Sequence, residues 1–208
     1  NPSSWFANQF VDFYNKTYEK NYHFQVTTAG VRSVMERVRD YLDDIGFVYI
    51  FSQQKENFLH ELAKNKMQFV PMYETEVILY PGRKTELYIS GKESVEPEDL
   101  NGLRFIQNYQ DEFFDISAAG EDGFQWRDLD ISVLTNSDYI MEKMLRNSRA
   151  SNVSGSYLSE NKKGTTPGIP LNMGDSRVIF GYILHRDEKI DESVQEFLDF
   201  LMERLPKS

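Results

Sequence analysis

Hydrophobic residues in the first third of the chain recur at spacings that switch between those of helices and those of strands. The predicted elements are a helix over 3–18, an extended β-rich run over 23–28, a helix over 31–42, a continuously apolar strand over 45–51 and a helix that carries Phe58, Leu59 and Leu62. This alternation at short spacing predicts an α/β sheet with parallel strands. The same pattern requires a strand before the first helix, so we expect the sequence to start just after its natural first strand.

The second half begins with a long extended segment, 69–83, which is broken by Pro71 and can carry the chain from one lobe to another. The stretch EPEDLNGLRFI at 96–106 follows. In it, Pro97 suits the first position of a helical turn and Gly102 suits its stop. The remaining predicted elements are strands over 104–109, 130–135 and 177–184, helices over 138–146 and 191–205, and a mobile surface loop over 159–170.

The composition limits the classes of function. The 208 residues include 33 acidic and 23 basic ones, so the formal net charge is −10. A surface that grips duplex DNA needs clustered lysine and arginine, which makes this chain by itself a poor DNA binder. The absence of cysteine from the sequence excludes disulfides, thiolate nucleophiles and cysteine-zinc sites. The sequence contains neither an apolar run long enough to span a bilayer nor a signal peptide, and we expect it to begin inside a longer protein.

The sequence shows no catalytic constellation. His23, His60 and His185 are far apart and lack the spacing of metal ligands, so we predict no metal site. The sequence contains no P-loop, no GxGxxG and no GxSxG, and its acidic clusters fit solvated faces or helix starts. Two glycosylation-like triplets, at Asn15 and Asn152, are of the kind that arises by chance. We therefore predict that the chain is not an enzyme, needs no cofactor, and binds a ligand between two α/β lobes.

Four blocks of sequence occur in an order that is known from one protein family. They are FANQFVDFYNKTYEKNYHFQV, VMERVRDYLDDIGFVYI, SVEPEDLNGLRFI and YILHRDEKIDESVQEFLDFLMERL. In this order the chain resembles the effector-binding domain of LysR-type bacterial transcription regulators, over nearly its whole length. It departs from the family at Lys20 or Asn21, where a proline is usual, and over 159–172, which has no obvious family pattern. The family's N-terminal winged helix-turn-helix is absent from the sequence.

The resemblance implies an α/β, two-lobed fold like that of type 2 periplasmic binding proteins, with two crossover strands near 73–77 and 173–177. Lobe I would comprise 1–73 plus 176–208, and lobe II would comprise 74–175. The implied function is that of a cytoplasmic ligand-sensing regulatory domain, which binds a small-molecule effector between the lobes and modulates promoter binding by the full-length protein. The alternative is an extracytoplasmic solute-binding receptor of the same fold, and a second alternative is an enzyme on this scaffold.

Candidate effector contacts follow from where open α/β sheets bind ligands, which is beyond the carboxyl ends of strands and near helix N-termini. The candidates are Ser3, Ser4, Thr27, Thr28, Gly30, Val31, Phe51, Ser52, Tyr109, Asp111, Phe113, Thr135, Asn136 and Ser137. The hydroxyl residues can equally be helix caps, and Tyr109 and Phe113 can be core aromatics. Hydroxyls at helix starts favour an anionic or carboxylated effector, whereas Asp111 and Glu112 favour one that bears an amine.

The resemblance also implies partners. Such domains pair side by side as homodimers, here through helices 31–42 and 138–146, which both have more apolar positions than one buried stripe needs. DNA would be bound only through the absent N-terminal domain, and no contact with a membrane is predicted.

Overall fold

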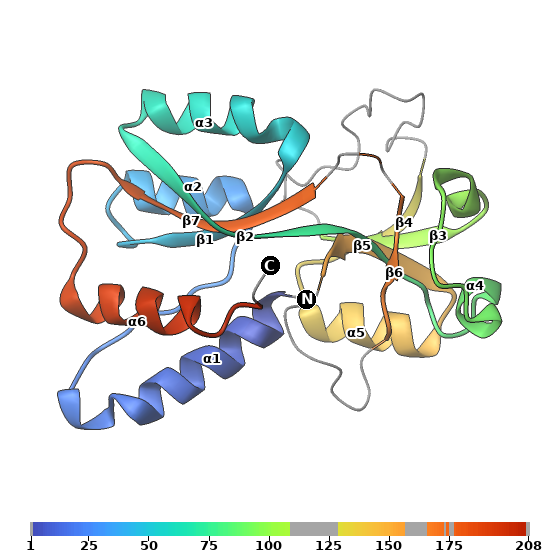
Figure 1. Cartoon of the computed structure of the whole chain (residues 1–208), viewed down its shortest axis with the longest axis horizontal. Coiled ribbons are helices and arrows are strands. Elements are labelled where there is room, and N and C mark those ends of the chain that lie inside the picture. The colour runs from blue at the N-terminus through green and yellow to red at the C-terminus, as the bar shows by residue number, and fades with distance from the viewer. Residues whose placement is uncertain (1, 109–128, 157–165, 173, 175–176, 207–208) are drawn as a thin grey trace.

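The computed structural model describes residues 2–108, 129–156, 166–172, 174 and 177–206 (Figure 1). Its helices are α1 (Pro2–Lys16), α2 (Val31–Arg39), α3 (Lys55–Lys64), α4 (Glu86–Ser90), α5 (Asp138–Asn147) and α6 (Glu192–Met202). Its strands are β1 (Gly46–Phe51), β2 (Met67–Tyr80), β3 (Arg104–Gln107), β4 (Asp130–Leu134), β5 (Ala150–Gly155), β6 (Ile169–Pro170) and β7 (Arg177–His185). Short 3-10 turns lie at Tyr18–Lys20, Ser52–Gln54 and Pro97–Leu100.

One long strand joins the two lobes of the molecule. The strand order is β1-β7-β2-β5-β3-β4, with β6 also paired to β2. Residues 67–76 of β2 pair with β7, and residues 77–80 pair with β5 (Figure 1). Lobe I therefore contains β1, β7 and the first part of β2, whereas lobe II contains the end of β2 with β3, β4, β5 and β6. This two-lobed α/β architecture confirms the predicted fold class.

The prediction of parallel strands is wrong for lobe I. β1 and β2 both run antiparallel to β7, and the parallel pairs among the described strands are β3 with β4 and β3 with β5. The prediction assumed that strands that follow one another in sequence are neighbours in the sheet. The neighbour of β1 is instead β7, which comes from the C-terminal part of the sequence. The expected strand over 23–28 is also wrong, because residues 21–30 belong to no strand of the sheet.

The two faces of β7 separate the two cores of lobe I. Ile179 and Ile183 point to the face covered by α2 and α3, where they join a cluster with Val38, Phe58 and Leu62. Phe180, on the alternate face, packs against α1 and α6. The cluster on that face is aromatic and contains Trp5, Phe13, Phe197 and Phe200. Figure 1 shows the two pairs of helices on opposite sides of this part of the sheet.

The stretch at 96–106 forms the predicted turn and strand. Pro97 takes the first position of a 3-10 turn, and the Asp99 carboxylate accepts a hydrogen bond from the Glu96 N–H at 2.8 Å. Gly102 has a φ of +79°, which favours glycine, and β3 starts two residues later. The turn thus directs the chain into a strand whose last residue, Gln107, reaches the pocket described below.

Two other predictions of elements differ from the structure. Helix α2 ends at Arg39 rather than at residue 42, because Tyr41 adopts a left-handed φ of +57°. Of the predicted loop over 159–170, residues Ile169–Pro170 form β6 against β2, and residues 159–165 lie outside the described part.

Candidate functional site

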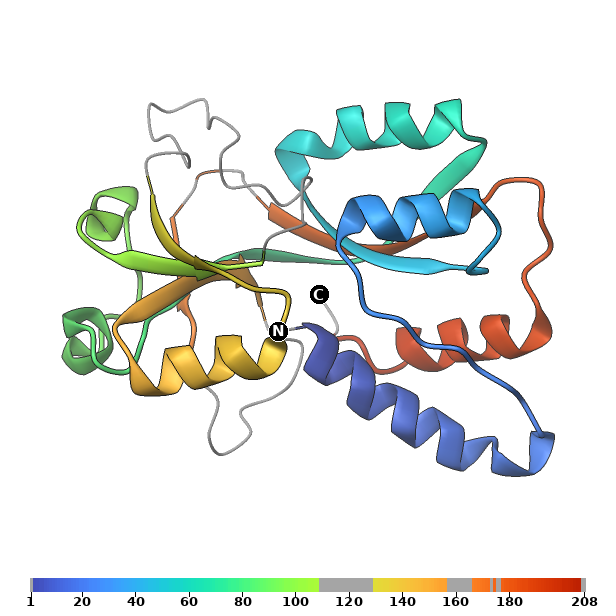
Figure 2. The same cartoon turned by 180° about the vertical axis from the view of Figure 1, so that it is seen from behind.

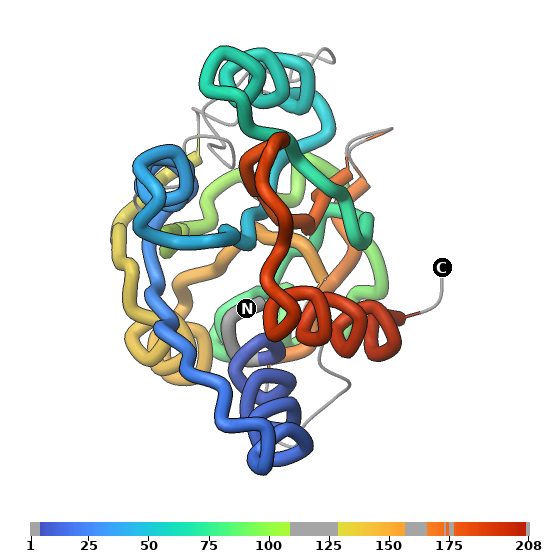
Figure 3. The backbone as a smooth tube through the Cα atoms, turned by 90° about the vertical axis from the view of Figure 1, so that its left-hand side faces the viewer, coloured from blue at the N-terminus to red at the C-terminus, as the bar shows by residue number. Residues whose placement is uncertain are grey.

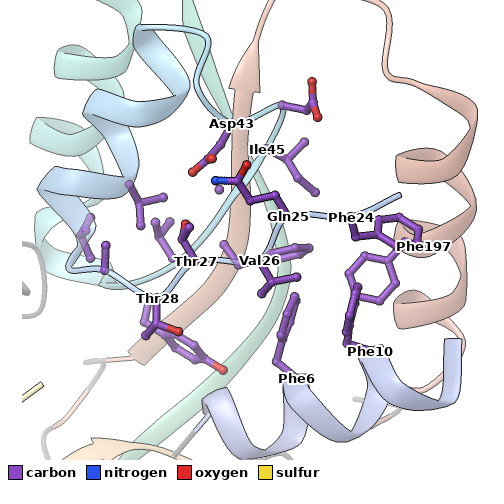
Figure 4. Close-up of a pocket in the computed structure, with 18 of the residues that line it drawn as sticks. Phe6, Phe10, Phe24, Gln25, Val26, Thr27, Thr28, Asp43, Ile45 and Phe197 are labelled. Carbon is purple, nitrogen blue, oxygen red and sulfur yellow. The ribbon is translucent and has the colours of Figure 1, made fainter. Parts of the chain in front are cut away.

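A cavity of about 800 Å³ lies between the two lobes and continues along lobe I as far as α1 and α6. Its walls come from α1, residues 21–29, β1 and α6 of lobe I, and from the ends of β3 and β4, the start of α5 and β5 of lobe II. The size falls within the range of pockets that hold small organic ligands. Figure 4 shows the lobe I part of this cavity, with side chains from α1, residues 24–28 and α6 around it.

The lobe II wall is built on the first turn of α5. Ser137 caps this helix, and its Oγ accepts a hydrogen bond from the Ile140 N–H at 3.4 Å. The Thr135 Oγ1 accepts from the Ser137 N–H at 3.1 Å, and the Thr135 N–H donates to the Gln107 carbonyl at 2.9 Å. These bonds fix the short segment that joins β4 to α5, so Thr135, Asn136 and Ser137 present a rigid polar edge to the cavity.

Two buried side-chain amides support that edge. The Asn152 Nδ2 donates to the Ile106 carbonyl at 2.9 Å and to the Gln107 Oε1 at 3.0 Å. The Gln107 Nε2 in turn donates to the Val153 carbonyl at 3.3 Å. Both amides line the cavity and both are buried, so their orientations are set by the strands around them. A ligand at this wall meets polar groups that are already in position.

The facing wall of lobe I is the extended segment before α2. Thr27 and Thr28 lie on this segment and are exposed (Figure 4). The Asp43 carboxylate is held by the Arg37 guanidinium through two hydrogen bonds of 2.7 Å and also bonds the Thr27 side chain. These bonds, that of Arg37 foremost, lower the pKa of Asp43 below its ordinary value. Asp43 thus fastens Thr27 at the edge of the cavity.

The end of the cavity that lies between α1 and α6 of lobe I is lined by aromatic side chains. The Phe24 ring packs edge-on against Phe10 at 5.4 Å and Phe13 at 5.9 Å between ring centroids. Phe197 of α6 meets Phe10 at 5.7 Å and Phe6 at 5.5 Å (Figure 4). Since Phe6, Phe10 and Phe24 are only partly buried, their rings give this end an apolar surface.

Tyr49 of β1 contributes its ring to this largely apolar wall. Its ring stacks on Phe180, with 4.7 Å between the centroids and 27° between the planes. The Tyr49 Oη is buried and has no hydrogen-bond partner in the described structure. Burial, with a smaller contribution from Tyr80, raises the pKa of Tyr49 well above its ordinary value, so the phenol stays protonated.

The structure brings together part of the predicted set of site residues. The residues of that set that line the cavity are Thr27, Thr28, Val31, Thr135, Asn136 and Ser137. Gly30 caps α2 without lining the cavity, Phe51 belongs to the core, and the Ser52 Oγ accepts a hydrogen bond from the Arg177 N–H at 3.0 Å. Tyr109, Asp111 and Phe113, and the side chains of Ser3 and Ser4, lie outside the described part. Helix α1 begins at Pro2, so the two serines occupy its first turn and not its cap.

The sequence did not single out several residues of the lining, among them Tyr49, Gln107, Asn152 and Ser154. Gln107 offered a signal, since it is the polar residue that ends an otherwise apolar run. Strand β5 offered almost none, because its sequence ASNVSG has small polar residues, although nearly all of it is buried. The triplet at Asn152, which was interpreted as a chance glycosylation pattern, is part of this buried strand.

The cavity is acidic where it is charged. Its described lining contains Asp43, Asp44, Asp138 and Asp191 and includes no lysine or arginine. Among the described residues, no cluster of histidine and carboxylate side chains could hold a metal ion. The helices of the described part are too short and too polar to cross a membrane.

Solved structures share the fold of this chain at low sequence identity, although no family model and no curated protein matches the sequence. The regulatory domain of CcmR from Synechocystis PCC6803, in complex with 2-PG, has a TM-score of 0.71 and 14% identity, over 97% of this chain and 91% of that one. The effector-binding domain of QuiR in complex with shikimate has a TM-score of 0.67 and 11% identity, over 95% and 88%.

Full-length CbnR, a LysR family transcriptional regulator in complex with its target DNA, has a TM-score of 0.63 and 10% identity, over 96% of this chain and 65% of that one. The chain therefore spans about two thirds of that full-length regulator. Together these structures confirm that the chain has the fold of LysR-type effector-binding domains.

Proposed function

We propose that the chain is the ligand-sensing regulatory domain of a LysR-type transcription regulator, and that a small-molecule effector binds in the interlobe cavity. The proposal rests on the fold and on the fact that both lobes line one cavity of ligand size. CcmR and QuiR, two proteins of this fold, are known in complex with small molecules. The effector contacts proposed from the predicted set are Thr27, Thr28, Val31, Thr135, Asn136 and Ser137.

The way the two walls are held supports a sensing role. Thr135 and Ser137 sit on a segment that hydrogen bonds fix to lobe II, whereas Thr27 and Thr28 sit on an extended segment outside the sheet. A ligand that contacts both walls binds one arrangement of the lobes better than others, and such differential binding shifts the population toward that arrangement.

The proposed domain limits are those that the sequence predicts: 1–73 plus 176–208 for lobe I, and 74–175 for lobe II. In the full-length protein a winged helix-turn-helix would bind the promoter, as full-length CbnR binds its target DNA. This division of labour agrees with the net charge of −10, which is unfavourable for direct contact with DNA. A regulator of this kind works in the cytoplasm and carries out no chemistry on its effector.

The proposed homodimer pairs the region of α2 with α5. Both helices lie on the same face of the molecule (Figures 2 and 3). Large apolar side chains are exposed on α5 and just after α2: Tyr139 and Ile140 of α5 are 69% and 47% exposed, and Tyr41 and Leu42 after α2 are 64% and 63% exposed. Exposed side chains of this size and kind are often covered by another protein chain.

A screen of metabolites by thermal shift tests the proposed function. A true effector raises the melting temperature in proportion to the logarithm of its concentration above Kd. Thr28→Val should reduce that shift, because it removes a hydroxyl from the lobe I wall, whereas Ser90→Ala, which removes an exposed hydroxyl outside the cavity, should leave it unchanged. An effector whose shift is the same in both variants and in variants of Thr135 would not bind in this cavity. Turnover of the bound compound would instead favour an enzyme.

A further inference from the structure

The side-chain amide of Asn152 has one hydrogen-bonding position left unused at the wall of the cavity. This residue lines the cavity and is only 5% exposed. Its Nδ2 donates one hydrogen to the Ile106 carbonyl at 2.9 Å and the other to the Gln107 Oε1 at 3.0 Å, so both amide hydrogens are used. The Oδ1, by contrast, accepts no hydrogen bond from the residues that the structure describes. Because polar atoms of enclosed side chains are nearly always paired, this oxygen indicates a partner that enters through the cavity.

The surrounding strands fix which end of the Asn152 amide is left over. The Ile106 carbonyl can only accept a hydrogen bond, so the amide nitrogen has to face it. The Gln107 amide is oriented in the same way, since its Nε2 donates to the Val153 carbonyl at 3.3 Å and its Oε1 then faces Asn152. Among the described residues, the unpaired oxygens that the protein encloses completely include the Tyr49 Oη but not the Asn152 Oδ1. The Oδ1 is therefore accessible from the cavity that its residue lines.

The chemistry of the missing partner follows from the nature of an amide oxygen. It accepts hydrogen bonds and cannot donate them, so its partner has to carry a proton, as a hydroxyl or an ammonium group does. A ligand that displaces water from this wall has to supply that proton itself, because an acceptor left unpaired weakens binding. An ether, a ketone or a carboxylate has no proton to give at this point. The described lining also includes no lysine or arginine, the side chains that commonly bind carboxylates and phosphates.

We propose that the effector carries a hydrogen-bond donor, a hydroxyl or an ammonium group, and that the Asn152 Oδ1 accepts its hydrogen. The inference rests on the proposed function, since it names the recognition chemistry of the same cavity. It makes Asn152 a specificity-determining residue, and it gives Gln107 the part of holding the Asn152 amide in its orientation.

Three single-ring probes test the proposal on the wild-type protein: benzyl alcohol, benzylamine and benzyl methyl ether, titrated by ligand-observed NMR at neutral pH. The alcohol and the protonated amine both carry a donor, whereas the ether keeps the ring and an oxygen but has no proton to donate. The better of the two donors should bind about 3- to 10-fold more tightly than the ether, as expected for one hydrogen bond. The order of alcohol and amine then shows whether a hydroxyl or an ammonium group fits the site.

The variant Asn152→Ala locates the effect. In this variant the better donor and the ether should bind about equally, because the acceptor is gone, and a comparison of two probes within one variant cancels any general loosening of the wall. The matched control is Asn147→Ala, which removes an exposed amide outside the cavity and should leave the preference for the donor unchanged. If Asn152→Ala does not fold, the side-chain amide resonances of Asn152 in wild type decide, since the better donor should shift them further than the ether does.

The results that overturn the proposal are equally definite. They are an ether that binds wild type as tightly as the better donor, a preference for the donor that persists in Asn152→Ala, or equal shifts of the Asn152 amide with both probes. If the metabolite screen yields a ligand of the cavity while one of these results is found, the sensing role stands and the donor chemistry is wrong. If the screen yields no ligand while the preference depends on Asn152, the recognition chemistry stands and the role as a sensor of metabolites fails.

Discussion

Phe24 anchors the segment that carries Thr27 and Thr28, and its removal is the sharpest test of how the cavity is held open. Residues 21–30 belong to no strand, so no ladder of backbone hydrogen bonds fixes them to lobe I. Phe24 instead packs edge-on against Phe10 at 5.4 Å and Phe13 at 5.9 Å. We therefore expect Phe24→Ala to loosen the segment and to weaken the binding of any ligand that contacts the two threonines.

The magnitude follows from the burial of the ring. Truncation of a fully buried phenylalanine to alanine costs about 3–5 kcal/mol, and Phe24 is only partly buried. About half of that cost, roughly 2 kcal/mol, is therefore expected, including the loss of the edge-on contacts. For a chain of this length, 2 kcal/mol corresponds to a fall in melting temperature of about 4–8 °C.

The assay is thermal and urea unfolding of wild type, Phe24→Ala and Val26→Ala, with thermal shift by an effector as a second measurement. Val26 lies two residues away on the same segment and is 54% exposed, so its truncation should change the melting temperature by less than about 2 °C. Phe24→Ala should also reduce the effector-induced shift more than Val26→Ala does. Equal melting temperatures in the two variants would refute the claim that the phenyl ring is the anchor.

Three further predictions concern other parts of the molecule. Asp43→Asn should lower stability at neutral pH, because Arg37 chiefly depresses the folded-state pKa of Asp43. The contribution is complete above the ordinary carboxyl pKa and disappears as pH falls through the lowered one, so the urea midpoints of variant and wild type should converge below the lowered pKa. A midpoint difference that persists there would contradict the assignment. Gly181→Ala should destabilise by about 1–3 kcal/mol or prevent folding, because the new Cβ would lie 2.4 Å from the Val70 carbonyl oxygen, and circular dichroism melting will measure the loss. Ile140→Glu should shift the protein from dimer to monomer in sedimentation at micromolar concentration, and an unchanged dimer would exclude α5 from the interface.

The sequence predicted those parts of the fold in which local pattern and burial agree. Strand β7 and helix α6 have long apolar runs at the correct period, and Pro97 and Gly102 place their turn through backbone geometry alone. The direction of the strands was not predictable in this way, because it depends on which strands become neighbours. β1 lies beside β7, more than one hundred residues away in sequence, and no periodicity encodes that pairing.

The candidate site was predictable where a helix begins after a strand. Thr135, Asn136 and Ser137 follow an alternating run and precede an amphipathic helix, so their place at the cavity could be inferred from order alone. Asn152 could not be found in this way, since it lies within a buried strand whose small polar residues resemble a loop. Tyr49 was hidden for a different reason, because one tyrosine within an apolar strand is indistinguishable from a core residue in the sequence.

The unequal anchoring of the two walls suggests how binding would reach the rest of the protein. On lobe II, the segment of Thr135 is fixed by backbone bonds, so a ligand has little to rearrange there. On lobe I, Thr27 and Thr28 lead through Gly30 directly into α2. Their segment is held by side chains: Phe24 packs against Phe10, Asp43 bonds Thr27, and the Tyr22 hydroxyl donates to Glu196. A ligand that contacts both walls therefore displaces the lobe I wall, which is held less firmly. That displacement moves the first turn of α2. Because that helix ends next to the exposed apolar face proposed for dimerisation, the path from cavity to interface is a single helix of nine residues. The proposed sensing role thus predicts that substitutions of the exposed residues of α2 change the response of the protein to its effector. The same substitutions should leave the affinity of the effector for the isolated monomer unchanged.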